Sequence, residues 1–341
     1  MNEGQSQAAT PELRNGGIGV SLAQTSEGRD AYFPGLLHYR SWRGAFRPPA
    51  ASVWPIARTA LMSLFRKWIF WIIYVLGLLI FLLFFFGQYL LAWAQTQAGE
   101  ADVQLGGWGR TNPRHLIQLF RGLLKLDGGP QTYYNFFAYQ GHIVMIVLAL
   151  AGSILIGNDL RFGSLPFYLS KPLSRGHYLL GKGLAVAVFI NLMTTLPALI
   201  LYAQWGLLES WDYFYEYFDL FLGILGYGAV LTVTLTLLLL ATATWLQRTA
   251  PLVMMWTTLF FFCRLLASAL VDGLRFSPRW RLIDLWNNHS LIGRTFLGMP
   301  ARPVEFSNQP PWYEAALVLG GVSLLCLTYL VRRIRAVEIV K

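Results

Sequence analysis

Residues Gly157–Gly183 read GNDLRFGSLPFYLSKPLSRGHYLLGKG, a polar stretch between two long apolar runs. This stretch is too short to form a domain of its own. Such a segment is either a plain turn between two membrane-spanning helices or a docking surface for another protein. Its charged residues and prolines are Asp159, Arg161, Pro166, Lys171, Pro172, Arg175 and Lys182.

The composition of the chain indicates an integral membrane protein. Hydrophobic residues make up 55% of its 341 residues and charged residues only 13%, whereas about 25% of a soluble domain is charged. Cys263 and Cys326 both lie inside apolar runs, so they predict no disulfide framework. The first long apolar run begins near Trp68, and we therefore expect no cleavable signal peptide.

Six apolar stretches are each long enough to cross a bilayer as a helix, because about 20 helical residues span roughly 30 Å. The alternating pattern of a membrane barrel is missing from the sequence. We therefore predict an all-α integral membrane protein with six transmembrane helices. The expected spans lie near residues 68–94, 136–156, 184–205, 217–245, 251–271 and 313–331.

An amphipathic helix is expected before the first span. It begins at Pro55, and its apolar face differs sharply from a face that carries hydroxyl and basic side chains. The pattern predicts a helix lying on the membrane surface, where basic side chains meet anionic lipid headgroups. Residues 1–50 are rich in Gly, Ser, Gln and Pro and predict a mobile cytoplasmic arm. The apolar face consists of Ala57, Leu61, Leu64, Phe65 and Trp68, and the polar face of Thr59, Ser63, Arg66 and Lys67.

The placement of Lys and Arg predicts that both termini are cytoplasmic. With that orientation, 17 basic residues lie in inner segments and nine in outer segments, as the positive-inside rule favours. The loop at about 157–183 is then cytoplasmic, and the outer loops are about 95–135 and 272–312. We interpret the net charge of +10 as a consequence of this topology rather than as a sign of nucleic-acid binding. We therefore expect membrane lipids, and no nucleic acid, as partners.

The two outer loops predict further helices. Asn112 and Pro113 begin an amphipathic pattern that runs to Lys125 and suits the outer membrane surface. The 272–312 loop is too polar to span the membrane and too aromatic to be a free linker. We expect it to form short helices packed over the outer end of the bundle.

The sequence shows only weak matches to nucleotide-binding, metal-binding and catalytic motifs. We therefore expect no enzyme activity, cofactor or metal in this chain. Gly176–Gly183 imitates a phosphate-binding loop, but its last position is Gly183 rather than Ser or Thr, and no strand precedes it. The five histidines are dispersed, with no HExxH or paired-cysteine spacing. The spans are nearly free of acids and bases.

Arg264 is a charged residue within an expected span. A charge at the centre of a bilayer costs about 2.5–3.5 kcal/mol on insertion scales, so it should face the bundle, a wet cavity or the headgroups. One hypothesis pairs Arg264 with Asp219, at the start of the fourth span. The alternative is that Arg264 snorkels to the outer headgroups.

Small residues and one proline predict how the spans pack. Glycines in the second and fourth spans permit close helix approach, and Pro197 predicts a kink in the third span. These glycines are Gly141, Gly152, Gly223, Gly226 and Gly228.

The loop carries an ordered series of motifs that is similar to a known family. It resembles the cytoplasmic loop of permease subunits of type-2 ABC transporters, an exporter family. Asp159 stands where a glutamate is common in that family. With the helix before span one and the six-span count, the resemblance covers about residues 55–335. The matching motifs are Asp159, Gly163-Ser164, Leu165, Ser170-Lys171-Pro172-Leu173-Ser174-Arg175 and Leu179-Leu180-Gly181-Lys182.

The resemblance implies a non-catalytic permease subunit in the cytoplasmic (inner) membrane of a bacterium. Its loop would be a coupling helix that docks on a cytoplasmic ABC ATP-binding subunit, which holds ATP and Mg. Two permease copies and two ATPases would form the transporter, with the path between the copies. The alternative is a membrane anchor or scaffold that recruits a cytoplasmic partner without transport. The resemblance assigns the ATPase-coupling loop to Asp159, Arg161, Gly163, Lys171, Pro172, Arg175 and Lys182.

Overall fold

A computed structural model describes most of the six expected spans and their connections. The predicted arm 1–50 lies almost entirely outside the described residues, as do most of the amphipathic segment 112–125 and the loop residues Gly163, Lys171 and Pro172. The structure describes residues 49–96, 103–104, 110–111, 122, 125–162, 175–299 and 308–333.

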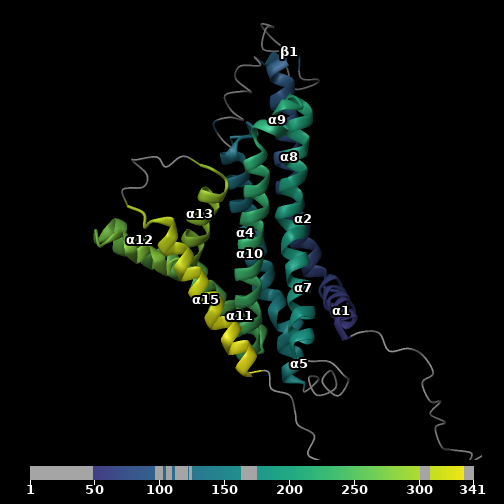
Figure 1. Cartoon of the computed structure of the whole chain (residues 1–341), viewed down its shortest axis with the longest axis vertical. Coiled ribbons are helices and arrows are strands. Elements are labelled where there is room, and N and C mark those ends of the chain that lie inside the picture. Colours follow the sequence, from purple (N-terminus) through teal and green to yellow (C-terminus); the bar gives the residue numbers. More distant parts are fainter. Residues whose placement is uncertain are drawn as a thin grey trace, which may run out of the picture. The chain divides into compact units, whose positions relative to one another are not determined.

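Helices make up nearly all of the described chain (Figure 1). The exception is a short antiparallel pairing of β1 (Val103–Gln104) with β2 (Arg110–Thr111). The helical elements in chain order are η1 (Pro49–Ser52), α1 (Val53–Phe65), α2 (Trp68–Thr96), α4 (Pro130–Gly152), η3 (Ser153–Gly157), α5 (Asn158–Arg161), α7 (Arg175–Met193), α8 (Thr195–Glu209), α9 (Asp212–Glu216), α10 (Phe218–Leu246), α11 (Thr249–Thr257), η4 (Thr258–Phe262), α12 (Cys263–Ser268), η5 (Ala269–Gly273), η6 (Pro278–Ile283), α13 (Leu285–Phe296) and α15 (Trp312–Arg333).

Six helical stretches of the described chain are long and apolar enough to cross a membrane, which confirms the predicted helical class and gives one such helix for each predicted span. Two of them are continuous through short π-helical turns, so α4, η3 and α5 form one stretch, and α11 to η5 form another. The stretches are Trp68–Thr96, Pro130–Arg161, Gly176–Glu209, Phe218–Leu246, Thr249–Gly273 and Trp312–Arg333.

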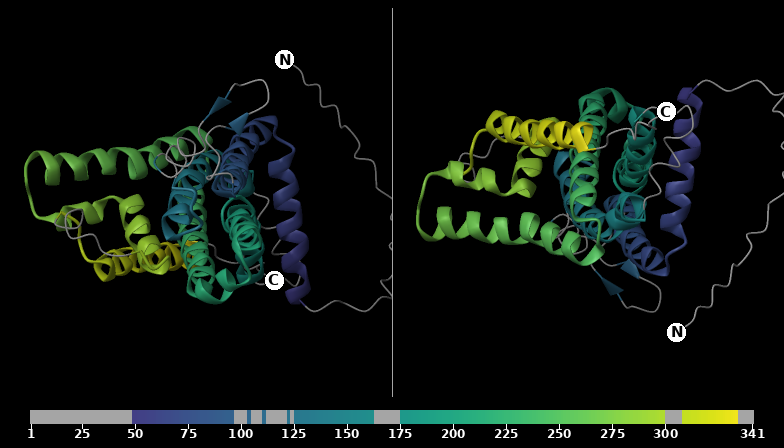
Figure 2. Two further views of the ribbon diagram at one scale, coloured as in Figure 1. Left: turned by 90° about the horizontal axis from the view of Figure 1, so that it is seen from above. Right: turned by 90° about the horizontal axis from the view of Figure 1, so that it is seen from below.

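The second and fourth spans form the centre of the packing. Helix α10 contacts α4, α7, α13 and α15 (Figure 2), and most of its side chains are buried. By contrast, α2 exposes large apolar residues such as Trp71, Leu79 and Phe86. A helix that is apolar on all sides suits either a lipid environment or a protein core, and the exposed faces of α2 fit lipid.

Helix α1 packs against α7, the first part of the third span. Its buried residues are Ala57, Ala60 and Leu64, so the predicted apolar face is largely the packed one. Trp68 is 74% exposed because it begins α2 rather than continuing α1. Close contact requires Gly181, where an added Cβ would lie 2.7 Å from Ile56 of α1.

The third span is interrupted at Thr194, between α7 and α8. Pro197 follows three residues later and has no N–H to donate to the carbonyl of Met193. The Thr194 hydroxyl and backbone N–H both donate to the Ile190 carbonyl, at 2.8 and 2.9 Å. The helix is therefore interrupted where Pro197 predicts a kink, with Thr194 at φ of −117° and ψ of −70°.

The predicted small-residue contacts are present, and they bring α13 deep along α10. An added Cβ at Gly223 would lie 2.2 Å from the Phe296 carbonyl oxygen, and one at Gly141 would lie 2.2 Å from the Trp286 ring. At the other end of α13, the His289 ring lies 2.6 Å from the Thr234 hydroxyl.

The expectation that the 272–312 segment forms short helices is confirmed, but their predicted position over the end of the bundle is wrong for α13. Thr234 lies about 12 Å along α10 from Gly226, at 1.5 Å per helical residue, and Phe296 packs on Gly226. Helix α13 can lie along α10 because Asn288 and His289, both buried, form hydrogen bonds inside the fold.

Candidate functional site

The candidate site is where the second and third spans emerge on either side of the 157–183 loop. The second span ends at Arg161, and Phe162 follows as its C-cap. The third begins with α7 at Arg175. The loop residues 163–174 between them lie outside the described chain.

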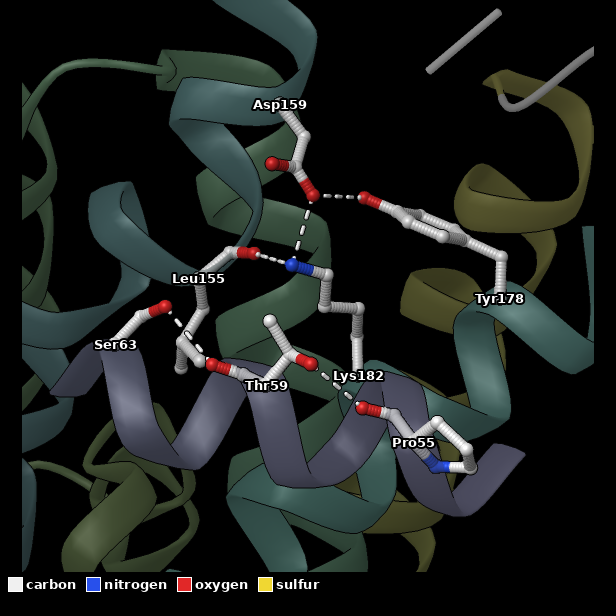
Figure 3. Close-up of polar contacts among 7 residues, drawn as sticks. All are labelled: Pro55, Thr59, Ser63, Leu155, Asp159, Tyr178 and Lys182. Carbon is white, nitrogen blue, oxygen red and sulfur yellow. Dashed lines mark hydrogen bonds and ion pairs between the residues drawn. The ribbon is translucent and has the colours of Figure 1, made fainter. Parts of the chain in front are cut away.

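An ion pair joins these two helix ends. Lys182 Nζ of α7 lies 2.8 Å from Asp159 Oδ2 of α5 (Figure 3). The two side chains are only 7% and 17% exposed, respectively. Burial strengthens the attraction and also makes either charge costly without the other. The pair therefore fixes the second span to the third at the base of the loop.

Further polar contacts satisfy both members of the pair. The Tyr178 hydroxyl donates to Asp159 Oδ2 at 2.9 Å, and Lys182 Nζ donates to the Leu155 carbonyl at 2.6 Å. Leu155 lies in the π-helical turn η3, where the wider hydrogen-bond pattern departs from the regular α-helical ladder. Tyr178 and Lys182 are one turn apart on α7, so both face Asp159.

Helix α1 runs beside this cluster. Figure 3 shows the Thr59 and Ser63 hydroxyls bonded to carbonyls of α1 itself. The donor–acceptor distances are 2.9 Å to the Pro55 carbonyl and 2.8 Å to the Thr59 carbonyl. The polar face of α1 is thus partly satisfied within the helix, while its apolar face covers α7.

The turn between α10 and α11 closes the cluster from another side. An added Cβ at Gly157 would lie 2.7 Å from the backbone oxygen of Gln247. Gln247 caps α10 in the left-handed conformation, with φ of 52°. The hydroxyl oxygens of Ser153 and Thr249 lie 2.6 Å apart. Four of the six spans therefore meet around η3 and the base of the loop.

The structure brings together two of the predicted site residues, Asp159 and Lys182. The two side chains contact each other and neighbouring groups of the chain. The family resemblance implied that Asp159 contacts the ATPase directly, and these internal contacts give it a different role. Arg161 is exposed, with its guanidinium carbon 5.4 Å from the centre of the Phe162 ring. Arg175 begins α7, whereas Gly163, Lys171 and Pro172 lie outside the described residues.

Sequence reasoning missed Tyr178, Leu155 and Gly157 as parts of the site. The spacing of Tyr178 and Lys182 would have placed both on one face of a helix. The carbonyl of Leu155 and the contact at Gly157 depend on the π-helical turn and on the α10–α11 connection, for which the sequence carries no comparable signal.

The segment that imitates a phosphate-binding loop is helical. Residues 176–183 belong to α7, and Gly181 packs against α1 rather than facing an open loop. Backbone N–H groups inside a helix are engaged in its own hydrogen bonds and cannot cradle a phosphate as a glycine-rich loop does.

The hypothetical pair of Asp219 and Arg264 is not formed. The ion pairs within the described ranges join Lys182 to Asp159, Arg279 to Glu314 and Arg281 to Asp272. Asp219 is in the first turn of α10, whereas α12, which carries Arg264, packs on η6 and α13. The α11–α12 span leans away from α10 (Figure 1), and this separates the two side chains.

Arg264 lines a cavity of about 460 Å³ between α4, α12, η6 and α13. Asp284 lies in the same lining, and burial raises the pKa of its carboxyl group above the ordinary range despite two backbone hydrogen bonds and the nearby Arg264 and Arg281. This cavity is separate from the cluster around Asp159.

Comparison of the chain with protein-family models and with curated proteins finds no match.

Proposed function

We propose that this chain is the transmembrane permease subunit of an ATP-driven transporter of the type-2 ABC kind, acting as an exporter. The observation that carries the proposal is the buried ion pair between Asp159 and Lys182 at the base of the loop. The ordered motifs from Asp159 to Lys182 supply the family resemblance. The ion pair supplies a mechanical reason for that loop to act on two spans together.

A permease without an ATPase of its own needs a partner that performs conformational work. A force applied to residues 163–174 would reach α5 and α7 through their covalent connections. Because Lys182 joins Asp159 and the Leu155 carbonyl, the two helix ends would move as one body. Packed helices shift as rigid elements between discrete arrangements, so such a force would tilt the second and third spans together.

The proposed assembly contains two permease copies and two cytoplasmic ATP-binding subunits, which hold ATP and Mg. The permease itself is non-catalytic and binds no nucleic acid. It lies in the bacterial inner membrane with both termini cytoplasmic, which the distribution of Lys and Arg supports. In this orientation α1 lies at the cytoplasmic surface, and the exposed Arg66 and Lys67 meet anionic headgroups.

The test is purification of the tagged full chain from its native membrane. The proposal predicts that a subunit with nucleotide-binding motifs is recovered in equal amount and that the complex hydrolyses ATP. Lys182→Met removes the charge while keeping a long apolar side chain. We expect it to lower ATP hydrolysis severalfold while the ATP-binding subunit remains bound, since the contact surface is unchanged.

Arg279→Gln is the matched control. It also removes one positive charge, but Arg279 pairs with Glu314 away from the loop, and we expect unchanged hydrolysis. Recovery of a cytoplasmic partner without nucleotide-binding motifs, and no ATP hydrolysis in the complex, would refute the permease proposal and favour a scaffold.

A further inference from the structure

Three arginines line the cavity between α4, α12, η6 and α13. Arg264 comes from α12, Arg281 from η6 and Arg294 from α13, and Asp284 is the single carboxylate in the lining. Its volume is about 460 Å³. Three guanidinium groups from separate elements therefore face one space that the described side chains do not fill.

Two carboxylates, Asp272 and Asp284, lie near Arg264 and Arg281. Arg281 Nη2 lies 2.6 Å from Asp272 Oδ1. Asp284 Oδ1 accepts hydrogen bonds from the backbone N–H groups of Trp286 and Asn287, at 2.9 and 3.1 Å. Asp272 therefore pairs with Arg281, whereas Asp284 is engaged by backbone N–H groups.

Two of the arginines have donor capacity that the described part of the protein does not use. No carboxylate there comes within ion-pair distance of Arg264. Arg281 Nε is buried and has no hydrogen-bond partner there. An unpartnered buried donor such as Arg281 Nε is costly, and the exposed guanidinium of Arg264 keeps its donors available to a ligand. An anion in the cavity would offset that cost.

The arrangement of the donors selects the class of anion. A planar carboxylate is satisfied by one guanidinium in a bidentate contact, whereas a tetrahedral phosphate offers oxygens in several directions to arginines from different elements. The rest of the lining includes the aromatic and apolar side chains of Tyr134, Trp286 and Leu291. We propose that this cavity binds a phosphate group, with Arg264 and Arg281 as its principal ligands.

The site stands apart from the proposed transport function. It uses none of the residues around Asp159 and Lys182, and phosphate binding can be measured on the purified chain without an ATPase. Both inorganic phosphate and the phosphodiester of an anionic lipid carry the required chemistry.

The experiment measures binding to the full chain purified in an uncharged detergent. Inorganic phosphate is titrated by isothermal calorimetry, and retention of phosphatidylglycerol against phosphatidylcholine is measured by native mass spectrometry. We compare the natural chain with Arg264→Gln, Arg281→Gln and Arg279→Gln. The last is a matched control, because Arg279 is exposed, pairs with Glu314 and lies outside the cavity lining.

We expect Arg264→Gln and Arg281→Gln each to weaken binding by about tenfold, the effect of losing one charge-assisted contact, while Arg279→Gln binds as the natural chain does. Binding of inorganic phosphate would support a soluble ligand, and selective retention of phosphatidylglycerol alone would support a lipid headgroup. The proposal is overturned if neither binds, or if Arg264→Gln binds as tightly as Arg279→Gln. Arg264→Gln decides the result if the loss of the Asp272 contact unfolds Arg281→Gln.

Discussion

Lys182 Nζ lies 2.8 Å from Asp159 Oδ2, and this contact joins the last turn of the second span to the first turns of the third. The same nitrogen donates to the carbonyl of Leu155, one turn before Asp159. Lys182 thus contacts the end of the second span at both Asp159 and Leu155. The loop between these helices is held at its base by charges that are largely withdrawn from solvent.

Removing one member of this pair should destabilise the protein more than removing both. Lys182→Met leaves a largely buried carboxylate, and Asp159→Asn leaves a buried ammonium group. We expect each to lower the free energy of unfolding by about 2–4 kcal/mol, towards the lower end for a broken buried pair because Asp159 keeps some exposure. Denaturant unfolding of the purified chain measures this.

The double variant Asp159→Asn/Lys182→Met should recover part of the loss, since it leaves no uncompensated charge. If the losses of the two single variants simply add in the double variant, the ion pair contributes nothing as a pair.

Gly157→Ala should be destabilising, because its Cβ would lie 2.7 Å from the backbone oxygen of Gln247. Backbone cannot rotate away as a side chain can, so α10 and η3 would have to separate. We expect a loss of about 1–3 kcal/mol, as for overpacking elsewhere, measured by thermal unfolding in detergent.

Gly320→Ala provides the comparison. Gly320 lies inside α15, and an added Cβ there meets nothing within 4 Å. Alanine is a better helix former than glycine by about 1 kcal/mol, so this variant should be neutral or slightly stabilising. Equal losses for both variants would mean that the contact with Gln247 does not matter.

Acidification should weaken the attachment of α13 through His289. The ring is buried, and this lowers its pKa to about 4. Its Nδ1–H donates to the Leu285 carbonyl at 2.8 Å, and Nε2 faces the Thr234 hydroxyl. The unfolded chain takes up a proton near pH 6.5, whereas the folded chain does so only near pH 4.

The contribution of His289 to the free energy of unfolding is therefore fully present above pH 6.5. It is lost as the pH falls towards 4, by up to about 3 kcal/mol. Unfolding temperatures measured across this range should fall more steeply for the natural chain than for His289→Gln. Parallel curves for the two proteins would contradict the buried neutral histidine.

The proposed topology predicts which positions a membrane-impermeant thiol reagent reaches in intact cells. In a background with Cys263→Ser and Cys326→Ser, the reagent should label Trp211→Cys and Ser277→Cys from outside. It should label Phe162→Cys only after the membrane is opened. All three positions are exposed on the protein. Labelling of Phe162→Cys in intact cells would reverse the orientation.

The sequence alone was sufficient to predict the long apolar helices, because they depend on the local run of apolar residues. A run of about 20 apolar residues can satisfy its backbone in a membrane only as a helix, and the six expected runs appear as six long apolar helices. The break near Thr194 was predictable for the same reason, since Pro197 removes a backbone donor wherever the helix lies. The sequence predicted that Gly141 and Gly223 allow close helix approach, but it did not predict that their partners lie on α13.

What the sequence could not determine depends on packing between distant segments. Asp159 and Lys182 were both identified as residues of the loop, yet their ion pair appears only when the second and third spans lie side by side. One hypothesis paired Arg264 with Asp219 and the alternative sent it to the headgroups, but the lean of α11–α12 places it in a cavity with Arg281 and Asp284. The helical class, the six long apolar helices and the interruption near Pro197 follow from local hydrophobicity and backbone chemistry. The partner of each buried charge was decided only by the tertiary structure, because a charge in a low-dielectric interior is stabilised by whichever opposite group the helix packing brings within reach.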